Sequence, residues 1–296
     1  MPNSISDFLS HIAATAKSTI KIALSGRPSA IPCGKHDTPL LILGNGPSLR
    51  GNIDHDLPLL QANDTLAVNF AANSPEFPAI RPDYYVLADP HFFSNPDDPN
   101  VSRLIQSLLH TDWTMTLFVP RKAKIPKALE SNQNLTVKRF NFVAAEGFGA
   151  FENFAYRHRL GMPRPRNVLI PSIMLGIWLG YREIYLLGAD HTWTKTLSVD
   201  DDNRVLSIQP HFYKEDAHEE CRIRKAYMNL PLHSILESFH IAFKSYHRIQ
   251  AYAEKAGVNI FNATPGSFID AFPRKALPSD ATTYKNLSLI HVSEPT

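Results

Sequence analysis

The stretch LLILGNGPSL, residues 40–49, decides the fold of this chain. Four consecutive apolar residues are typical of a strand buried on both faces, as in a parallel sheet. The glycines and the proline that follow predict a tight turn. Because glycine has no Cβ, this turn can bring backbone N–H groups close to a phosphate. The same residues also fit a turn that binds no ligand.

A second unit of the same kind lies further along the chain. Residues Pro171–Leu179 have helical periodicity, with a proline where a first turn tolerates it and Gly180 where the helix should stop. The buried run Glu183–Leu187 follows and ends in Gly188, Ala189 and Asp190. This pattern predicts a helix that leads into a buried strand, with an acidic residue at the strand's carboxyl end.

The remaining runs complete an alternation of strands and helices. Further strands are predicted at 65–70, 84–88, 114–119, 135–142 and 258–261. Helices are predicted at 101–109, with Asn100 as the cap, and over 219–255, interrupted at Pro231. The alternation predicts an α/β fold: a Rossmann-like, doubly wound, mostly parallel sheet with a lid over the carboxyl ends of its strands.

Three parts of the chain are predicted. Residues 1–36 form an amphipathic helix and a linker, 37–274 a Rossmann-like catalytic domain with its lid at about 191–239, and 275–296 a tail. Residues 197–208 alternate in polarity and predict an exposed hairpin within the lid. The apolar face of the N-terminal helix is short and lacks Trp, which favours packing on the domain or on a partner chain over contact with a membrane surface.

The composition narrows the classes of protein to which this chain can belong. The chain has 296 residues, is 44% hydrophobic and 20% charged, and carries a formal net charge of +2. These values are typical of a soluble globular protein and supply no global field for nucleic acid. No apolar run approaches the roughly 18 residues of a spanning helix. Two cysteines favour a reducing compartment, so we expect a cytoplasmic protein, with any membrane contact peripheral and at the inner face.

In a doubly wound sheet, ligands bind outside the carboxyl ends of the strands. Leu49 replaces the third glycine of a dinucleotide fingerprint, and Asn69 stands where an acidic ribose partner is expected, so an NAD enzyme is disfavoured. The turn also lacks the lysine of a P-loop. No metal-ligand spacing is present, so no metal site is predicted. Four arginines precede the helix at Pro171 and fit either a solvated loop or an anion partner: Arg157, Arg159, Arg164 and Arg166.

The motifs GNGPSL, DPHFF at 89–93 and LGYREIYLLGAD at 179–190 resemble the bacterial sialyltransferases of glycosyltransferase family 42 and the related MptE-like superfamily. That superfamily includes motility accessory factors and archaeal 6-hydroxymethylpterin diphosphokinases. The resemblance spans Leu40–Ser267. It implies that His240 is a general base, that Asn45, Gly46, Ser48 and Asn69 contact the nucleotide part of a CMP-sugar, and that Asn167 contacts the donor.

Three positions depart from the family pattern, and one is Asn167, which stands where the sialyltransferases have a threonine. His91 stands where the sialyltransferases have an asparagine in the substrate site, and Thr192 where they have a tyrosine for the leaving phosphate. With the strand ends included, the predicted catalytic residues are His240, Asp190 and His91. The predicted donor-binding set is Gly44, Asn45, Gly46, Pro47, Ser48, Asn69, Asp89, Asn167, Gly188, His191, Trp193, His211 and Tyr213.

Three hypotheses follow. The first is a glycosyltransferase without a cofactor, which transfers a sialic-acid-like or other sugar from a CMP-linked donor to a surface glycan. The second is an MptE-like diphosphokinase in which Asp89 and Asp190 hold Mg²⁺ on ATP. The third is a non-catalytic scaffold in polysaccharide assembly. Family analogy predicts a homo-oligomer, and no nucleic acid partner is expected.

Overall fold

The computed structural model describes residues 4–25, 27–207, 211–213 and 230–277. Its centre is a seven-stranded sheet in the order β5-β4-β3-β2-β1-β6-β9, in which every pairing is parallel. The strands are β1 (Leu40–Leu43), β2 (Asp64–Val68), β3 (Tyr84–Val86), β4 (Met115–Pro120), β5 (Leu135–Phe140), β6 (Glu183–Leu187) and β9 (Asn259–Asn262). The chain moves outward from β1 to β5 and then returns to place β6 on the other side of β1. The predicted doubly wound sheet is confirmed, with its switch point between β1 and β6.

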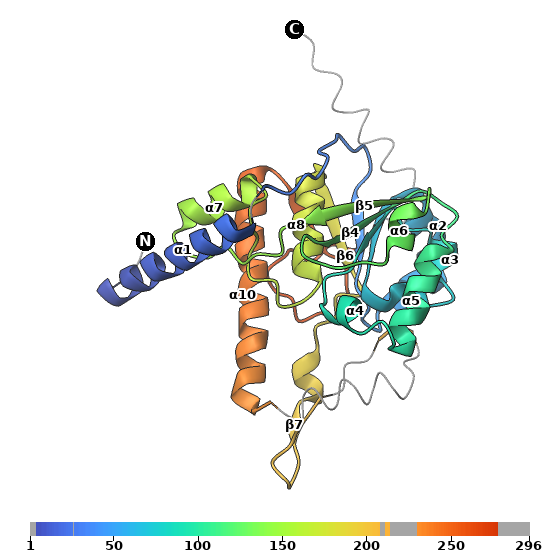
Figure 1. The fold of residues 1–296 in the computed structure, drawn as a ribbon. Helices are drawn as coiled ribbons and strands as arrows, with labels where there is room; N and C mark the ends of the chain where they lie inside the picture. The colour runs from blue at the N-terminus through green and yellow to red at the C-terminus, as the bar shows by residue number, and fades with distance from the viewer. Residues whose placement is uncertain (1–3, 26, 208–210, 214–229, 278–296) are drawn as a thin grey trace.

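Helices cover both faces of the sheet (Figure 1). On one face lie α2, α3, α5 and α6, and on the other α8 and α10. The helices are α1 (Ile5–Ser25), α2 (Leu49–Ala62), α3 (Phe77–Ile80), α4 (His91–Ser94), α5 (Pro99–Leu109), α6 (Lys127–Ser131), α7 (Gly149–Arg157), α8 (Leu169–Leu179) and α10 (Leu232–Ala256), with 3₁₀ turns η1 (Asn69–Asn73) and η2 (Trp193–Thr196).

β1 shows why a continuous apolar run is needed at the centre. Successive side chains of a strand point to opposite faces. Leu40 and Ile42 pack with the α8 and α10 side of the core, whereas Leu41 and Leu43 pack with α2 on the other side. All four residues are buried, so a polar residue at any of these positions would lose its hydration.

Two predicted helix starts are corrected. α8 begins at Leu169, two residues before Pro171, because the Asn167 side chain accepts hydrogen bonds from the backbone N–H groups of Leu169 (3.0 Å) and Ile170 (3.3 Å). α5 is capped by Asp98 and not by Asn100. The extended backbone of Asp98 places its carboxylate on the N–H groups of Asn100 and Val101, and proline occupies the first helical position.

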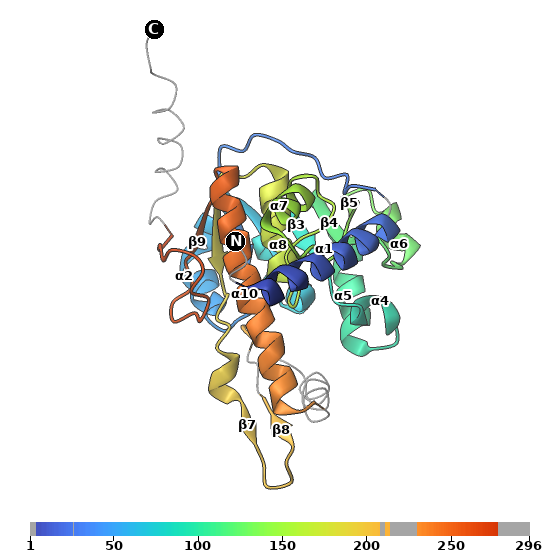
Figure 2. The same cartoon turned by 90° about the vertical axis from the view of Figure 1, so that its left-hand side faces the viewer.

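The predicted hairpin is present as β7 (Ser198–Val199) and β8 (Val205–Leu206), which pair antiparallel. Figure 2 shows it projecting beside the first half of α10. Val205 packs there with Ile235 and Phe239. The rest of the predicted lid, at 208–210 and 214–229, lies outside the described residues, as does most of the predicted tail.

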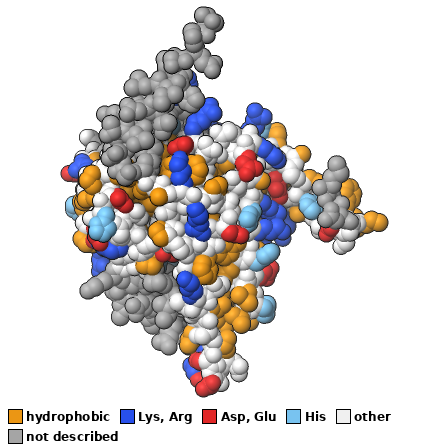
Figure 3. Space-filling model, turned by 180° about the vertical axis from the view of Figure 1, so that it is seen from behind, with side chains coloured by type: hydrophobic (Ala, Val, Ile, Leu, Met, Phe, Trp, Pro, Cys, Tyr) orange, Lys and Arg blue, Asp and Glu red, His pale blue; other side chains and the backbone are white. Residues whose placement is uncertain are grey.

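The N-terminal helix α1 turns its apolar face away from the domain. Ile5, Leu9, Ile20 and Leu24 are 81%, 58%, 62% and 73% exposed, whereas Ser18 is buried. In Figure 3, hydrophobic side chains (orange) are visible on the surface at the projecting end of this helix. This face is therefore not packed on the domain, and its packing on a partner chain stays a prediction. Among the described residues, no helix combines the length and the apolarity needed to cross a membrane.

Gly188 provides a test of the packing at the switch point. It has φ +60°, and a Cβ there would lie 2.3 Å from the Gly44 carbonyl oxygen. We expect Gly188→Ala to lower the free energy of unfolding by about 2 kcal/mol or more, from overpacking and backbone strain. Urea unfolding of the purified variant measures this loss.

The matched control is Gly51→Ala. Gly51 lies in α2, and a Cβ there meets nothing within 4 Å. Since alanine is the better helix former, this variant should gain about 0.5–1 kcal/mol. Equal stabilities for the two variants would contradict the close approach of β1 and β6.

Candidate functional site

A cavity of about 370 Å³ lies at the switch point, at the carboxyl ends of β1, β2, β3 and β6 and at the first turn of α8. Parallel sheets of this kind bind ligands at this place. Its lining residues are Gly44, Asn45, Gly46, Val68, Asn69, Ala88, Asp89, Pro90, Phe142, Pro165, Arg166, Asn167, Val168, Leu169, Gly188, Asp190, His191, Thr192, Trp193 and His211.

The floor of the cavity is backbone. Gly44 N–H donates to the Leu187 carbonyl (2.7 Å) and Gly46 N–H to the Gly188 carbonyl (2.8 Å), so the turn after β1 lies directly against the end of β6. A Cβ on Gly46 would come within 2.0 Å of Asp190 Oδ2. The glycines of the GNG motif are therefore required by the contact between the two strand ends.

Asp190 is held in place at this floor. The Ser48 hydroxyl donates to Asp190 Oδ2 over 2.7 Å, and Asp190 lines the cavity while partly exposed. Ser48 itself does not line the cavity; it fixes the carboxylate that does. The second predicted acidic residue, Asp89, lines the same cavity, and its Oδ1 accepts from the His91 N–H (2.8 Å).

The amino end of α8 forms one wall. Asn167 Oδ1 accepts from two backbone N–H groups of α8 and from the Tyr246 hydroxyl (2.9 Å). This arrangement orients the first turn of the helix, whose partial positive charge favours an anion. Within the described part of the chain, Asn167 Nδ2, Asn45 Oδ1 and Asn69 Oδ1 are buried without a hydrogen-bond partner, and all three residues line the cavity.

His191 is a buried, neutral side chain at the same wall. Because the Tyr246 hydroxyl donates to Asn167, His191 Nε2 carries the proton and donates to Tyr246 Oη (2.6 Å). Burial lowers the pKa of His191 to about 3. Its backbone is in the left-handed region at φ +52°, and its ring lies 4.1 Å from that of Trp193. The imidazole is therefore a fixed neutral donor and a weak base.

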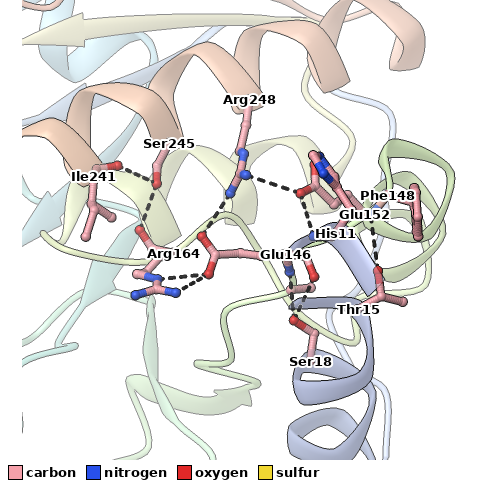
Figure 4. A network of polar contacts seen from close by, with 12 residues as sticks. His11, Thr15, Ser18, Glu146, Phe148, Glu152, Arg164, Ile241, Ser245 and Arg248 are labelled. Atoms are coloured by element: carbon pink, nitrogen blue, oxygen red, sulfur yellow. Dashed lines mark hydrogen bonds and ion pairs between the residues drawn. The ribbon is translucent and has the colours of Figure 1, made fainter. Parts of the chain in front are cut away.

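Arg166 is an exposed cation at the rim of the cavity. In the part of the chain that the structure describes, its guanidinium has no ion-pair partner. The neighbouring Arg164 differs, because it pairs with Glu146, which also accepts from Arg248 over 2.9 Å (Figure 4). Burial acts to raise the pKa of Glu146, but these two arginines outweigh it and lower that pKa. Arg164 thus anchors the loop, and Arg166 is left available to a ligand.

Most of the predicted donor-binding residues meet at this cavity. Ten of them line it: Gly44, Asn45, Gly46, Asn69, Asp89, Asn167, Gly188, His191, Trp193 and His211. The other three, Pro47, Ser48 and Tyr213, do not. Pro47 is exposed, and the Tyr213 ring stacks on that of His211 (5.1 Å) and packs against the core.

Two of the three predicted catalytic residues are not in the cavity. His91 begins α4, and its Nε2 lies 3.3 Å from Asp98 Oδ2. His240 is exposed on α10 and lines a separate shallow groove with Phe243, Lys244 and His247. Phe239 and Tyr246 lie on the buried face of α10. His240 follows Phe239 by one residue, a rotation of about 100° around the helix axis, and therefore lies away from that face.

Sequence reasoning left out several lining residues, including Phe142, Pro165 and Val168. They carry no chemical signal in the sequence, because backbone and apolar atoms line the cavity there. Arg166 could be found, since it lies in the basic run before α8. Among the described residues, no group of three or more His, Cys, Asp or Glu is arranged to share a metal ion.

His191 makes stability depend on pH. Its pKa is about 3 when folded and about 6.5 when unfolded, so the unfolded chain takes up the proton first as the pH falls. The contribution of neutral His191 to the free energy of unfolding is complete above pH 6.5 and is lost progressively as the pH falls toward 3. Between pH 7 and pH 5, the free energy of unfolding should fall by about 2 kcal/mol more in the wild type than in His191→Gln.

Urea unfolding at the two pH values measures this difference. His233→Gln is the matched control, because it removes a histidine from an exposed position of α10. Parallel pH profiles for the wild type and His191→Gln would show that His191 is not buried as a neutral group.

Comparison with known proteins supports the fold. No protein-family model matches the sequence, and no curated protein sequence matches it either. Among solved structures, the chain is similar to the MAf glycosyltransferase from Magnetospirillum magneticum AMB-1, with a TM-score of 0.51 and 13% sequence identity. The match covers 96% of this chain and 41% of that chain, so this chain spans about two fifths of its length. At this identity, the likeness establishes a shared fold.

Proposed function

We propose that this chain is a glycosyltransferase that takes a sugar from a nucleotide-activated, CMP-linked donor and transfers it to a glycan hydroxyl. The observation that carries the proposal is one cavity where the Gly44–Gly46 turn and the first turn of α8 meet Arg166, which has no ion-pair partner among the described residues. The structural neighbour, which shares this fold, is itself described as a glycosyltransferase.

The proposed donor site carries positive charge that suits a phosphate. Transfer of the sugar breaks the bond between its anomeric carbon and a phosphate oxygen, and negative charge grows on the leaving nucleotide. The partial positive charge at the start of α8 and the Arg166 guanidinium would both stabilise that charge. The amides of Asn45, Asn69 and Asn167 keep atoms without partners and would bind the polar edges of the nucleotide.

We assign the proton transfer to Asp190. The acceptor hydroxyl loses a proton as its oxygen attacks the anomeric carbon. Of the three predicted catalytic residues, Asp190 is the one that lines the cavity, and Ser48 fixes its orientation. His191 is a poor base there because its pKa is about 3.

The diphosphokinase remains the second candidate, because Asp89 and Asp190 both line the cavity. Carboxylates are the ligands that Mg²⁺ uses when it bridges ATP phosphates. In that reaction the two residues would hold the metal ion, and nucleotide binding would require Mg²⁺. Metal dependence therefore separates the two functions.

Thermal unfolding with a panel of nucleotides tests the donor class. We expect CMP or CDP to raise the melting temperature in the presence of EDTA, since a ligand at a hundredfold excess over its Kd stabilises by about 2.7 kcal/mol. Arg166→Gln should reduce the shift strongly, whereas Arg103→Gln, which alters an exposed arginine on α5, should leave it unchanged.

The other outcomes of the nucleotide panel would reject the transferase. A shift with ATP and Mg²⁺ that EDTA abolishes would replace the transferase with the diphosphokinase. No shift with any nucleotide would favour the scaffold hypothesis and overturn both enzymes.

Release of CMP from CMP-sialic acid, with water as acceptor, tests the base. Asp190→Asn should lower the rate by about 10²-fold or more, the range expected when a general base is removed. His240→Ala should retain the rate within about threefold, because His240 lies outside the cavity. The reverse pattern would make His240 the base, as the family resemblance implies.

A further inference from the structure

A second hollow lies at the opposite end of α8 from the candidate site. α8 leaves the cavity at Leu169 and ends at Leu179, about 15 Å away. The hollow has a volume of about 840 Å³ and is formed by the linker at Cys33–Asp37, α7, and the carboxyl ends of α8 and α10. It lies at the amino end of the sheet, where nothing in the proposed reaction takes place.

Positive charge is concentrated in this hollow. Its lining includes five cationic side chains and one carboxylate, Asp37; the cations are Lys35, Arg157, Arg159, Arg182 and Lys255. The whole chain carries a net charge of only +2. The carboxyl ends of α7, α8 and α10 contribute about half a negative charge each, so an excess of about 2.5 positive charges remains.

These cations are not used in the ion pairs of the fold. Arg159 donates to the backbone carbonyls of Ile31 and Trp178 and so fixes the linker to α8. The other four are exposed, and in the described residues none of them has an ion-pair partner. Elsewhere on α10, by contrast, Arg248 is paired with Glu146.

The walls of the hollow are formed before any ligand binds. Gly34 N–H donates to the Leu179 carbonyl (2.8 Å), and the His36 ring stacks on Tyr181 at 3.7 Å. A Cβ on Gly180 would lie 2.3 Å from the Gly34 carbonyl oxygen, so the linker is seated directly on the end of α8. Trp178 and Tyr252 are buried beneath it. Because the backbone that carries the cations is already ordered, less free energy is needed to arrange them around an anion.

We propose that this hollow is a second binding site, for a ligand that carries two or more phosphate charges. Four cations on a concave wall, none of them ion-paired within the described part of the chain, match the charge and the many acceptor oxygens of such a ligand. Arginine supplies a planar fork for phosphate oxygens and lysine a point charge, and the hollow offers both. The inference is independent of the proposed transferase, since it uses none of the residues of the first cavity.

Calorimetric titration with inorganic pyrophosphate, without metal ions, tests the site. We expect binding that weakens as salt is added, because salt screens the exposed charges. The double variant Arg182→Gln, Lys255→Gln should weaken it by about tenfold or more. A control with the same change in charge, Arg103→Gln with Lys122→Gln, alters exposed residues outside the hollow and should retain binding.

Arg166→Gln separates the two sites, because it alters the first cavity alone. Binding that survives Arg166→Gln and is lost in the double variant supports the proposal. Binding lost in Arg166→Gln and retained in the double variant overturns it. Thermal unfolding of each variant checks that it is folded.

Two arms distinguish the source of the phosphate. Sedimentation with vesicles that contain cardiolipin, a lipid with two phosphates, compared with phosphatidylcholine vesicles, tests a lipid headgroup, and the pyrophosphate titration tests a soluble ligand. Vesicle binding that the double variant loses, without pyrophosphate binding, would assign the site to a lipid phosphate. Failure of both arms would leave the hollow without a phosphate ligand and refute the inference.

Discussion

The close contact between the ends of β1 and β6 is the constraint on which the rest of the structure depends. Gly44 and Gly46 bond to the carbonyls of Leu187 and Gly188, and side chains at these glycines would collide with the backbone or with Asp190. This contact forms the switch point of the sheet. It also places the turn after β1, the carboxylate of Asp190 and the first turn of α8 around one cavity.

α8 connects the two hollows of the molecule. Its amino end, oriented by Asn167, faces the candidate site, where the helix dipole favours an anion. Its carboxyl end faces the basic hollow, where cations partly offset the opposite end of the same dipole. Because the helix is fully buried between these ends, it holds the two hollows at a fixed separation.

The histidines show how helix rotation and burial decide chemistry. His191 follows β6 directly, is covered by Trp193 and Tyr246, and stays neutral. His240 lies on the exposed side of α10. The sequence contains both residues as ordinary histidines, and the packing around each determines which one can reach a ligand in the cavity.

The sequence by itself determined the doubly wound sheet and most of the cavity lining, since these follow from local patterns. An apolar run predicts a buried strand, glycines after it predict a close backbone turn, and parallel strands carry their carboxyl ends to one edge. Tertiary structure decided the rest: the positions of His240 and His91 outside the cavity, an Arg166 without an ion-pair partner among the described residues, the outward face of α1 and the basic hollow. Those features depend on how helices rotate and which distant residues meet, and such contacts between segments far apart in the chain leave no periodic trace in the sequence.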